Sequence, residues 1–146
     1  MEKEILIVVI DGQGGGIGRS YIQSLKKVLP KDKKIIIRAL GTNSTAADHM
    51  RKGGATDSAA GENAIIRNAA KADIIVGLTA IVIADSILGE ISPAMSKAVG
   101  ESPGMRILIP FDSCNTRIAM AVSGTLQELI DRAVVLTLQR IDELMD

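Results

Sequence analysis

Seven residues near the N-terminus combine types and spacing that suit the binding of an anion. Glycines let the main chain turn tightly and approach a ligand closely. The loop follows an aliphatic run at residues 5–10, and helical periodicity begins directly after it, so free amides and the helix dipole would favour negative charge there. The pattern predicts a phosphate-binding loop made of backbone. Its residues are Gly12, Gln13, Gly14, Gly15, Gly16, Ile17 and Gly18.

Two glycine spacings that hold dinucleotide phosphates can be compared with this loop. The fingerprint G-x-G-x-x-G fits at Gly12 and Gly14 but fails at Ile17. The spacing G-x-x-x-G-x-G is satisfied by Gly12, Gly16 and Gly18, and with it the loop resembles the cofactor loop of short-chain dehydrogenases. That resemblance implies a site for the pyrophosphate of NAD or NADP.

The resemblance to short-chain dehydrogenases ends at the loop. Those enzymes use a Tyr-x-x-x-Lys pair with a serine, whereas Tyr21, the only tyrosine, has Leu25 four residues later. Their proton-transfer chemistry is therefore not carried over to this chain.

Residues after the second predicted strand, 33–40, would contact the ribose of a dinucleotide. An acid is expected there for the 2′-hydroxyl of NAD, but the segment offers Thr42, Asn43 and Ser44 and contains no acid. Hydroxyls, an amide and Arg38 suit a 2′-phosphate better, so the sequence predicts NADP. Arg38 could equally point away from the site as an edge residue.

A nucleotide-hydrolase loop is an alternative interpretation. Residues 15–20 look like the G-G-x-G-K-[ST] core of deviant Walker A ATPases, and residues 81–85 could pass for a Walker B strand. Arg19, however, stands where the phosphate-bridging lysine belongs, and Gly14 stands where the signature lysine would be. A planar guanidinium does not simply replace a compact ammonium, so the dinucleotide interpretation is preferred.

Several carboxylates lie near predicted strand ends and helix starts. Asp11 could hold a metal, but bracing the loop is its favoured role. Asp85 and Glu90 could act as acid, base or Mg²⁺ ligands, and a turn cap is the default for them. Glu62 and Asn63 could touch a ligand, although Glu in a first helical turn is ordinary dipole chemistry.

The single cysteine and the single histidine are far apart in the sequence. Cys114 could be a nucleophile at the predicted site edge, but a small packed thiol is favoured. His49 is expected to interact with the C-terminal carbonyls of its helix. No His, Cys and Asp cluster has metal-ligand spacing, so no metal site is predicted.

Alternating patterns of strand and helix must position these residues. They predict an α/β fold: a three-layer Rossmann-like sandwich with a mostly parallel sheet of about five strands and helices on both faces. Residues 81–84 could extend the third strand or form another, and residues 55–61 read as a mobile loop. The predicted strands are 4–10, 33–40, 73–77, 105–109 and 117–122, and the predicted helices are 17–29, 44–53, 62–71, 93–100 and 125–144. Ser44 or Thr45 is expected to cap the second of these helices.

Composition limits the class of protein. The 146 residues fit a single domain, 1–146, and 47% hydrophobic content is typical of a globular chain. Seventeen basic residues balance seventeen acidic ones and aromatics are only 1%, so no nucleic-acid partner is predicted. No segment predicts a membrane span, and the lone cysteine suits a reducing compartment. A cytoplasmic location is expected.

Over its full length the chain resembles a family of short bacterial proteins described only as a domain of unknown function. The resemblance supports the fold and carries no activity. The motifs that carry it are residues 11–18 (DGQGGGIG), 41–44 (GTNS), 61–66 (GENAII), 83–86 (IADS), 89–90 (GE) and 114–115 (CN).

Three functional hypotheses follow. The preferred one is a nucleotide- or dinucleotide-binding protein with NADP as cofactor, either a compact oxidoreductase or a cofactor sensor. The second is a divergent P-loop nucleotide hydrolase. The third is a non-catalytic regulatory homodimer formed through the last helix, where Val135 and Leu138 lie off the main apolar stripe. This second stripe could mark a subunit contact or could equally be buried within the monomer.

Overall fold

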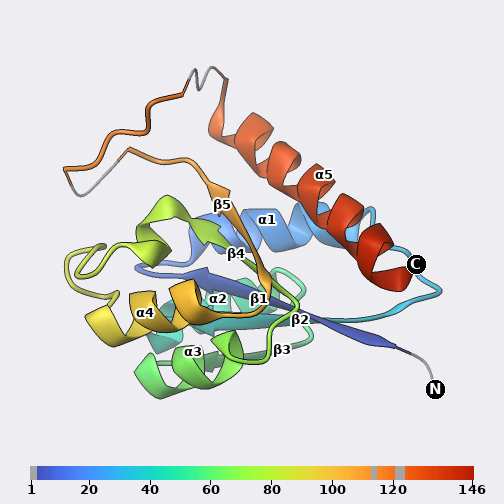
Figure 1. Ribbon diagram of the computed structural model, residues 1–146, viewed down its shortest axis with the longest axis horizontal. Coiled ribbons are helices and arrows are strands. Elements are labelled where there is room, and N and C mark those ends of the chain that lie inside the picture. The colour runs from blue at the N-terminus through green and yellow to red at the C-terminus, as the bar shows by residue number, and fades with distance from the viewer. Residues whose placement is uncertain (1–2, 113–114, 121–123) are drawn as a thin grey trace.

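A computed structural model describes residues 3–112, 115–120 and 124–146. Within them, five parallel strands form one sheet in the order β3–β2–β1–β4–β5, and helices cover both faces (Figure 1). This Rossmann-like three-layer sandwich confirms the predicted fold class. The strands are β1 (Glu4–Asp11), β2 (Lys34–Gly41), β3 (Asp57–Ala60), β4 (Ile74–Leu78) and β5 (Met105–Ile109). The helices are α1 (Gly16–Lys26), α2 (Ser44–Lys52), α3 (Glu62–Ala69), α4 (Pro93–Glu101) and α5 (Leu126–Met145), with a 3₁₀ turn η1 (Thr79–Val82).

The unbroken aliphatic sequence of β1 follows from its burial on both faces. Ile7 and Val9 belong to the core under α1, α2 and α5, whereas Val8 and Ile10 belong to the core under α3 and α4. A strand covered on both sides has no solvent face, so no polar residue interrupts its run.

The strand order determines where the site can lie. β1 pairs with β2 along its whole length and with β4 on its other side. The chain moves outward from β1 to β3 and then crosses to β4, so the strand order reverses between β1 and β4. Ligands of open parallel sheets bind in the crevice outside the carboxyl ends of the strands at such a point.

Helix α5 packs one apolar stripe onto the α1 side of the sheet. Leu138, which was expected on a second stripe, also packs against this core, and Val135 is 42% exposed. One of the two residues of that second stripe is therefore used within the chain, and a homodimer through α5 stays a prediction. No helix in the described residues has both the length and the apolar character needed to cross a bilayer.

Three predicted elements were wrong. The expected loop at residues 55–61 contains β3, which pairs with β2 although its small residues carry no apolar period. Residues 81–84 do not form a strand, because the chain turns into η1 directly after β4. In the expected strand 117–122, residues 117–120 are not in a strand and residues 121–122 lie outside the described residues.

The start of α2 also differs from the prediction. Its cap is Asn43, and neither Ser44 nor Thr45 fills that role: the Asn43 side chain accepts the amide of Ala46 at 2.8 Å. Asn43 has extended backbone and ends the loop after β2, and an asparagine in that position is a strong N-cap.

Candidate functional site

The glycine loop joins β1 to α1 through left-handed backbone. Gln13 has φ 47° and Gly15 has φ 71°. A Cβ atom on Gly15 would lie 2.6 Å from the carbonyl oxygen of Ala46 in α2. Gly15 is therefore required both for its backbone conformation and for the close approach of α2.

Asp11 braces this loop from inside, as its favoured role predicts. Its buried carboxylate accepts the amide of Gly12 at 2.8 Å and the amide of Gly18 at 2.8 Å. Burial is the largest influence and raises the pKa of Asp11 above its ordinary value, whereas the two amides lower it and the charge of Glu90 raises it.

Three other amides of the loop and of α1 remain available to a ligand. The amide of Gln13 donates to Glu90 and that of Gly15 donates to the carbonyl of Gly12. Within the described residues, no group accepts a hydrogen bond from the amides of Gly14, Gly16 and Ile17. Free amides at a helix N-terminus form a site for an anion.

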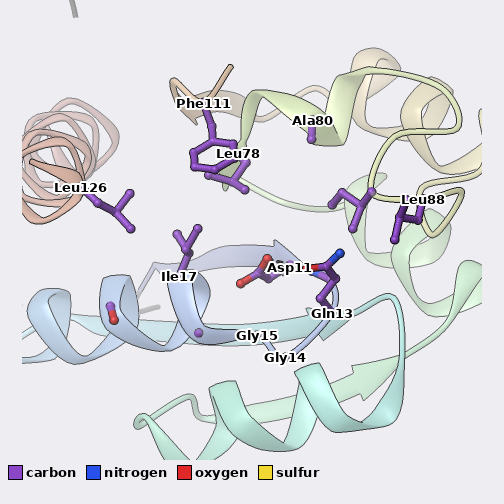
Figure 2. Close-up of a pocket in the computed structure, with 14 residues that line it drawn as sticks. Asp11, Gln13, Gly14, Gly15, Ile17, Leu78, Ala80, Leu88, Phe111 and Leu126 are labelled. Atoms are coloured by element: carbon purple, nitrogen blue, oxygen red, sulfur yellow. Dashed lines mark hydrogen bonds between the residues drawn. The ribbon is translucent and has the colours of Figure 1, made fainter. Parts of the chain in front are cut away.

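These amides border a cavity of about 680 Å³, which is in the range of small-molecule sites. Figure 2 shows Ile17 on one side, Leu78 and Phe111 opposite, and Leu88 and Leu126 at the two ends. Among the described residues that line the cavity there is no Lys, Arg or His, and Asp11 is the one carboxylate. The remaining lining residues are Gly12, Gln13, Gly14, Gly15, Gly16, Ser20, Ala80 and Ile87.

Loops that follow neighbouring strands meet at this edge of the sheet. The hydroxyl of Thr79, after β4, donates to the carbonyl of Phe111, after β5, at 3.1 Å. Among the described residues, Thr42, Asn43 and Ser44 are not part of the cavity lining.

Thr42 and Asn43 instead form a network around Glu90. The Thr42 hydroxyl donates to Glu90 Oε1, and Asn43 Nδ2 donates to the same oxygen at 2.9 Å and to the carbonyl of Gln13 at 3.0 Å. Glu90 thus joins the segment after β4 to the end of β2. No local sequence pattern predicts this role, because its partners Thr42 and Asn43 are 48 and 47 residues away.

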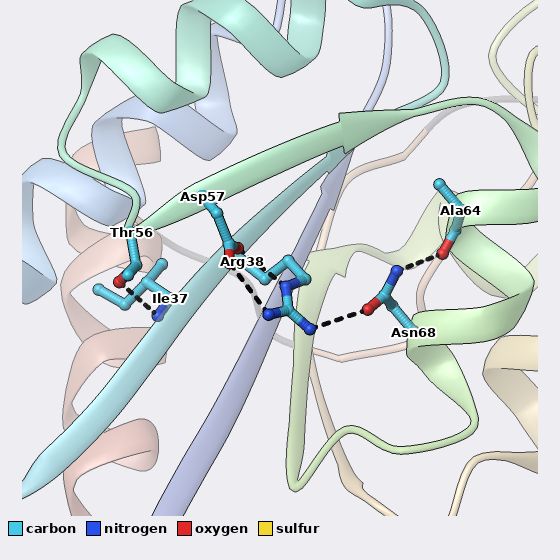
Figure 3. Close-up of polar contacts among 6 residues, drawn as sticks. All are labelled: Ile37, Arg38, Thr56, Asp57, Ala64 and Asn68. Carbon is cyan, nitrogen blue, oxygen red and sulfur yellow. Dashed lines mark hydrogen bonds and ion pairs between the residues drawn. The ribbon is translucent and has the colours of Figure 1, made fainter.

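Arg38 is engaged elsewhere. Its guanidinium forms two hydrogen bonds to Asp57, of 2.8 and 2.9 Å, and a third of 3.1 Å to Asn68 of α3 (Figure 3). Hydrogen bonds from Arg38 hold the pKa of Asp57 below its ordinary value. Arg38 therefore joins β2, β3 and α3 and does not line the cavity.

Two basic residues near the glycine loop, Arg19 and His49, do not line the cavity. The stem of Arg19 packs against Gly53, where an added Cβ would lie 2.8 Å from Arg19 Cγ, and Arg19 does not line the cavity. His49 was expected at the carbonyls of its own helix. Its Nδ1 instead lies 2.7 Å from the carbonyl oxygen of Gly14, so His49 supports the glycine loop from α2.

The remaining candidates do not converge on the cavity. Glu62, in the first turn of α3, accepts the hydroxyl of Ser92 at 2.6 Å, and Asn63 and Asp85 are exposed. Cys114 lies outside the described residues. Within the residues described, no group of three or more His, Cys, Asp or Glu side chains could hold a metal ion.

Comparison with known proteins identifies a family. Residues 6–142 match the family described as Domain of unknown function (DUF3842), and the chain belongs to it. No curated protein and no solved structure matches the chain.

Proposed function

We propose that this protein binds a nucleotide or dinucleotide, with its phosphates at the free amides of Gly14, Gly16 and Ile17. One observation carries the proposal. These three amides, at the N-terminus of α1, have no acceptor among the described residues and border the cavity of about 680 Å³ at the switch point of the sheet.

The charges around the cavity favour a dinucleotide over a nucleoside triphosphate. In the pyrophosphate of a dinucleotide, each phosphorus has one ester and one anhydride bond and carries a single negative charge, which backbone amides can balance. A triphosphate carries several more charges, and the described lining offers Asp11 and no cation to meet them. Arg19 packs against Gly53, at the C-terminal end of α2, and does not line the cavity, which weakens the P-loop alternative.

The apolar side of the cavity suits a planar ring. Ile17, Leu78 and Phe111 present aliphatic and aromatic surface to it. A nicotinamide or flavin ring would be covered there, so both a compact oxidoreductase and a cofactor sensor fit the proposal. Turnover of a hydride acceptor by the pure protein would separate these two activities.

Gly16→Ala provides the test of binding. A Cβ on Gly16 meets no atom within 4 Å, so the variant should fold. Side chains in a helix tilt toward its N-terminus, which places the new methyl group where a phosphate would approach. Calorimetric titration with NAD⁺, NADP⁺ and ATP–Mg²⁺ should show dinucleotide binding to the wild type and at least about tenfold weaker binding to Gly16→Ala.

Gly100→Ala is the matched control. Gly100 is a helical glycine with equally open surroundings, but it lies in α4 and does not line the cavity. This variant should bind like the wild type. The proposal fails if millimolar dinucleotide gives neither heat nor a thermal shift, or if Gly16→Ala binds as tightly as Gly100→Ala.

A further inference from the structure

Glu90 supplies a carboxylate at the end of β2 although it comes from the segment after β4. Its Oε1 accepts the amide of Gln13 at 3.0 Å, Asn43 Nδ2 at 2.9 Å and the hydroxyl of Thr42. A Cβ placed on Gly12 would lie 3.2 Å from the same oxygen. The carboxylate therefore lies directly against the glycine loop.

One oxygen of this carboxylate remains open to a ligand. Among the described residues, every hydrogen bond to Glu90 goes to Oε1 and none goes to Oε2. Partial burial raises the pKa of Glu90, but the hydrogen bonds from Thr42, Gln13 and Asn43 outweigh it, and the pKa lies below its ordinary value. Glu90 is thus an ionised acceptor at neutral pH.

The backbone that carries Glu90 is strained. Asp85, Ile87 and Leu88 have φ values of 63°, 55° and 54°, a region that is unfavourable for a β-branched residue such as Ile87. Ile87 Cγ2 would lie 3.2 Å from a Cβ on Gly12, so packing against the loop holds the segment in place. Strained backbone concentrates at ligand sites, and here it positions Glu90 beside the glycine loop.

In dinucleotide-binding sheets, an acid beyond the second strand accepts a hydrogen bond from the ribose 2′-hydroxyl. The end of β2 has no acid of its own, and Glu90 places one there. A 2′-phosphate would face this negative charge, and Arg38, the cation expected to balance it, is held by Asp57. We infer that Glu90 binds the ribose diol of the ligand and selects a free 2′-hydroxyl over a 2′-phosphate. This inference rests on the proposed function and reverses the preference for NADP that the sequence alone favoured.

The ligand series NAD⁺, NADP⁺ and the 2′-deoxy analogue of NAD⁺ tests this inference on the wild-type protein. A hydrogen bond to a charged group corresponds to about tenfold or more in affinity. NAD⁺ should therefore bind at least about tenfold more tightly than either of the other two ligands.

Glu90→Gln should remove the discrimination. Glutamine keeps an acceptor oxygen for Thr42 and Gln13 but carries no charge, so NAD⁺ and NADP⁺ should bind it within about threefold of each other. Glu62→Gln is the matched control, because it removes a carboxylate that accepts the hydroxyl of Ser92 and, within the described residues, has no hydrogen bond to the glycine loop. It should retain the wild-type ratio, and melting temperatures will verify that both variants are folded.

The outcomes separate the two proposals. If NADP⁺ binds the wild type as tightly as NAD⁺, or if folded Glu90→Gln retains the wild-type ratio, the role of Glu90 is overturned while dinucleotide binding stands. If neither dinucleotide binds the wild type, the proposed function fails, and the inference about Glu90 fails with it.

Discussion

The carboxylate of Asp11 accepts the amide of Gly18 at 2.8 Å, across a separation of seven residues. The same carboxylate accepts the amide of Gly12 at 2.8 Å, so one buried side chain holds the first and the last glycine of the loop. The amides between them are consequently held in position before a ligand arrives. Such preorganisation lowers the entropic cost of binding.

Asp11→Asn should destabilise the protein by about 1–3 kcal/mol, because a buried N–H group loses its acceptor. The asparagine oxygen can accept one of the two amides, but its NH₂ group then faces the other. Urea unfolding measures the change. Asp48→Asn is the control: its exposed pair with Lys52, at 3.0 Å, contributes little, and its loss should stay within about 0.5 kcal/mol. An equal effect of both substitutions would contradict the bracing role of Asp11.

Asp11 and Glu90 should contribute to stability with opposite pH dependence. Burial raises the pKa of Asp11 above 3.8, so the folded protein holds this proton more tightly than the unfolded chain does. The resulting contribution to stability is fully present below pH 3.8 and is lost as the pH rises through the folded pKa. For Glu90, burial is outweighed by hydrogen bonds, and the pKa falls below 4.5. Its contribution is present above 4.5 and is lost as the pH falls through the folded pKa.

Urea unfolding of wild type, Asp11→Asn and Glu90→Gln between about pH 3 and 6 tests these signs. With rising pH, the stability advantage of wild type over Asp11→Asn should shrink, and its advantage over Glu90→Gln should grow. Slopes of the same sign would show that one of the two assignments is wrong.

The fold could be predicted where burial imposes a pattern. β1 is buried on both faces and reads as an unbroken aliphatic run, and α5 (Leu126–Met145, capped by Thr125) closely matches the predicted helix 125–144. β3 could not be predicted, because it is a short edge strand of small residues held by pairing with β2. Residues 81–84 resembled a strand, but Ile81 is buried within η1, which begins directly after β4.

The site could be predicted in part. The glycine loop and the bracing role of Asp11 follow from local sequence, since a loop between a buried strand and a helix has few alternatives. The roles of Glu90 and His49 depend on contacts with segments distant in the chain, at Thr42 and Gly14 respectively. No local sequence pattern predicts such contacts. The position of Phe111 in the apolar lining of the cavity could not be predicted for the same reason.

Gly18→Ala should destabilise the protein by about 1–3 kcal/mol through overpacking between α1 and α2. A Cβ on Gly18 would overlap the sulfur of Met50, which is fully buried, and would lie 3.2 Å from Asp11 Cβ. Because the clash involves Met50, the double variant Gly18→Ala/Met50→Ala should lose at least about 1 kcal/mol less than the sum of the single changes. Additive losses in urea unfolding would show that contact with Met50 is not the reason why Gly18 tolerates no larger residue.

Leu88→Gly should be more stable than Leu88→Ala, by about 0.5–1 kcal/mol. Leu88 has φ 54° and is 93% exposed, so its side chain adds left-handed strain without adding burial. Glycine removes a strain of about 1–2 kcal/mol, which exceeds the additional unfolded-state entropy it brings, whereas alanine keeps the strain.

Both variants remove apolar surface at the cavity end, so both should bind dinucleotide more weakly than wild type. Thermal unfolding and calorimetric titration measure the two effects. If Leu88→Gly were the less stable variant, the segment would not be strained, and the support that strain gives to the placement of Glu90 would be lost.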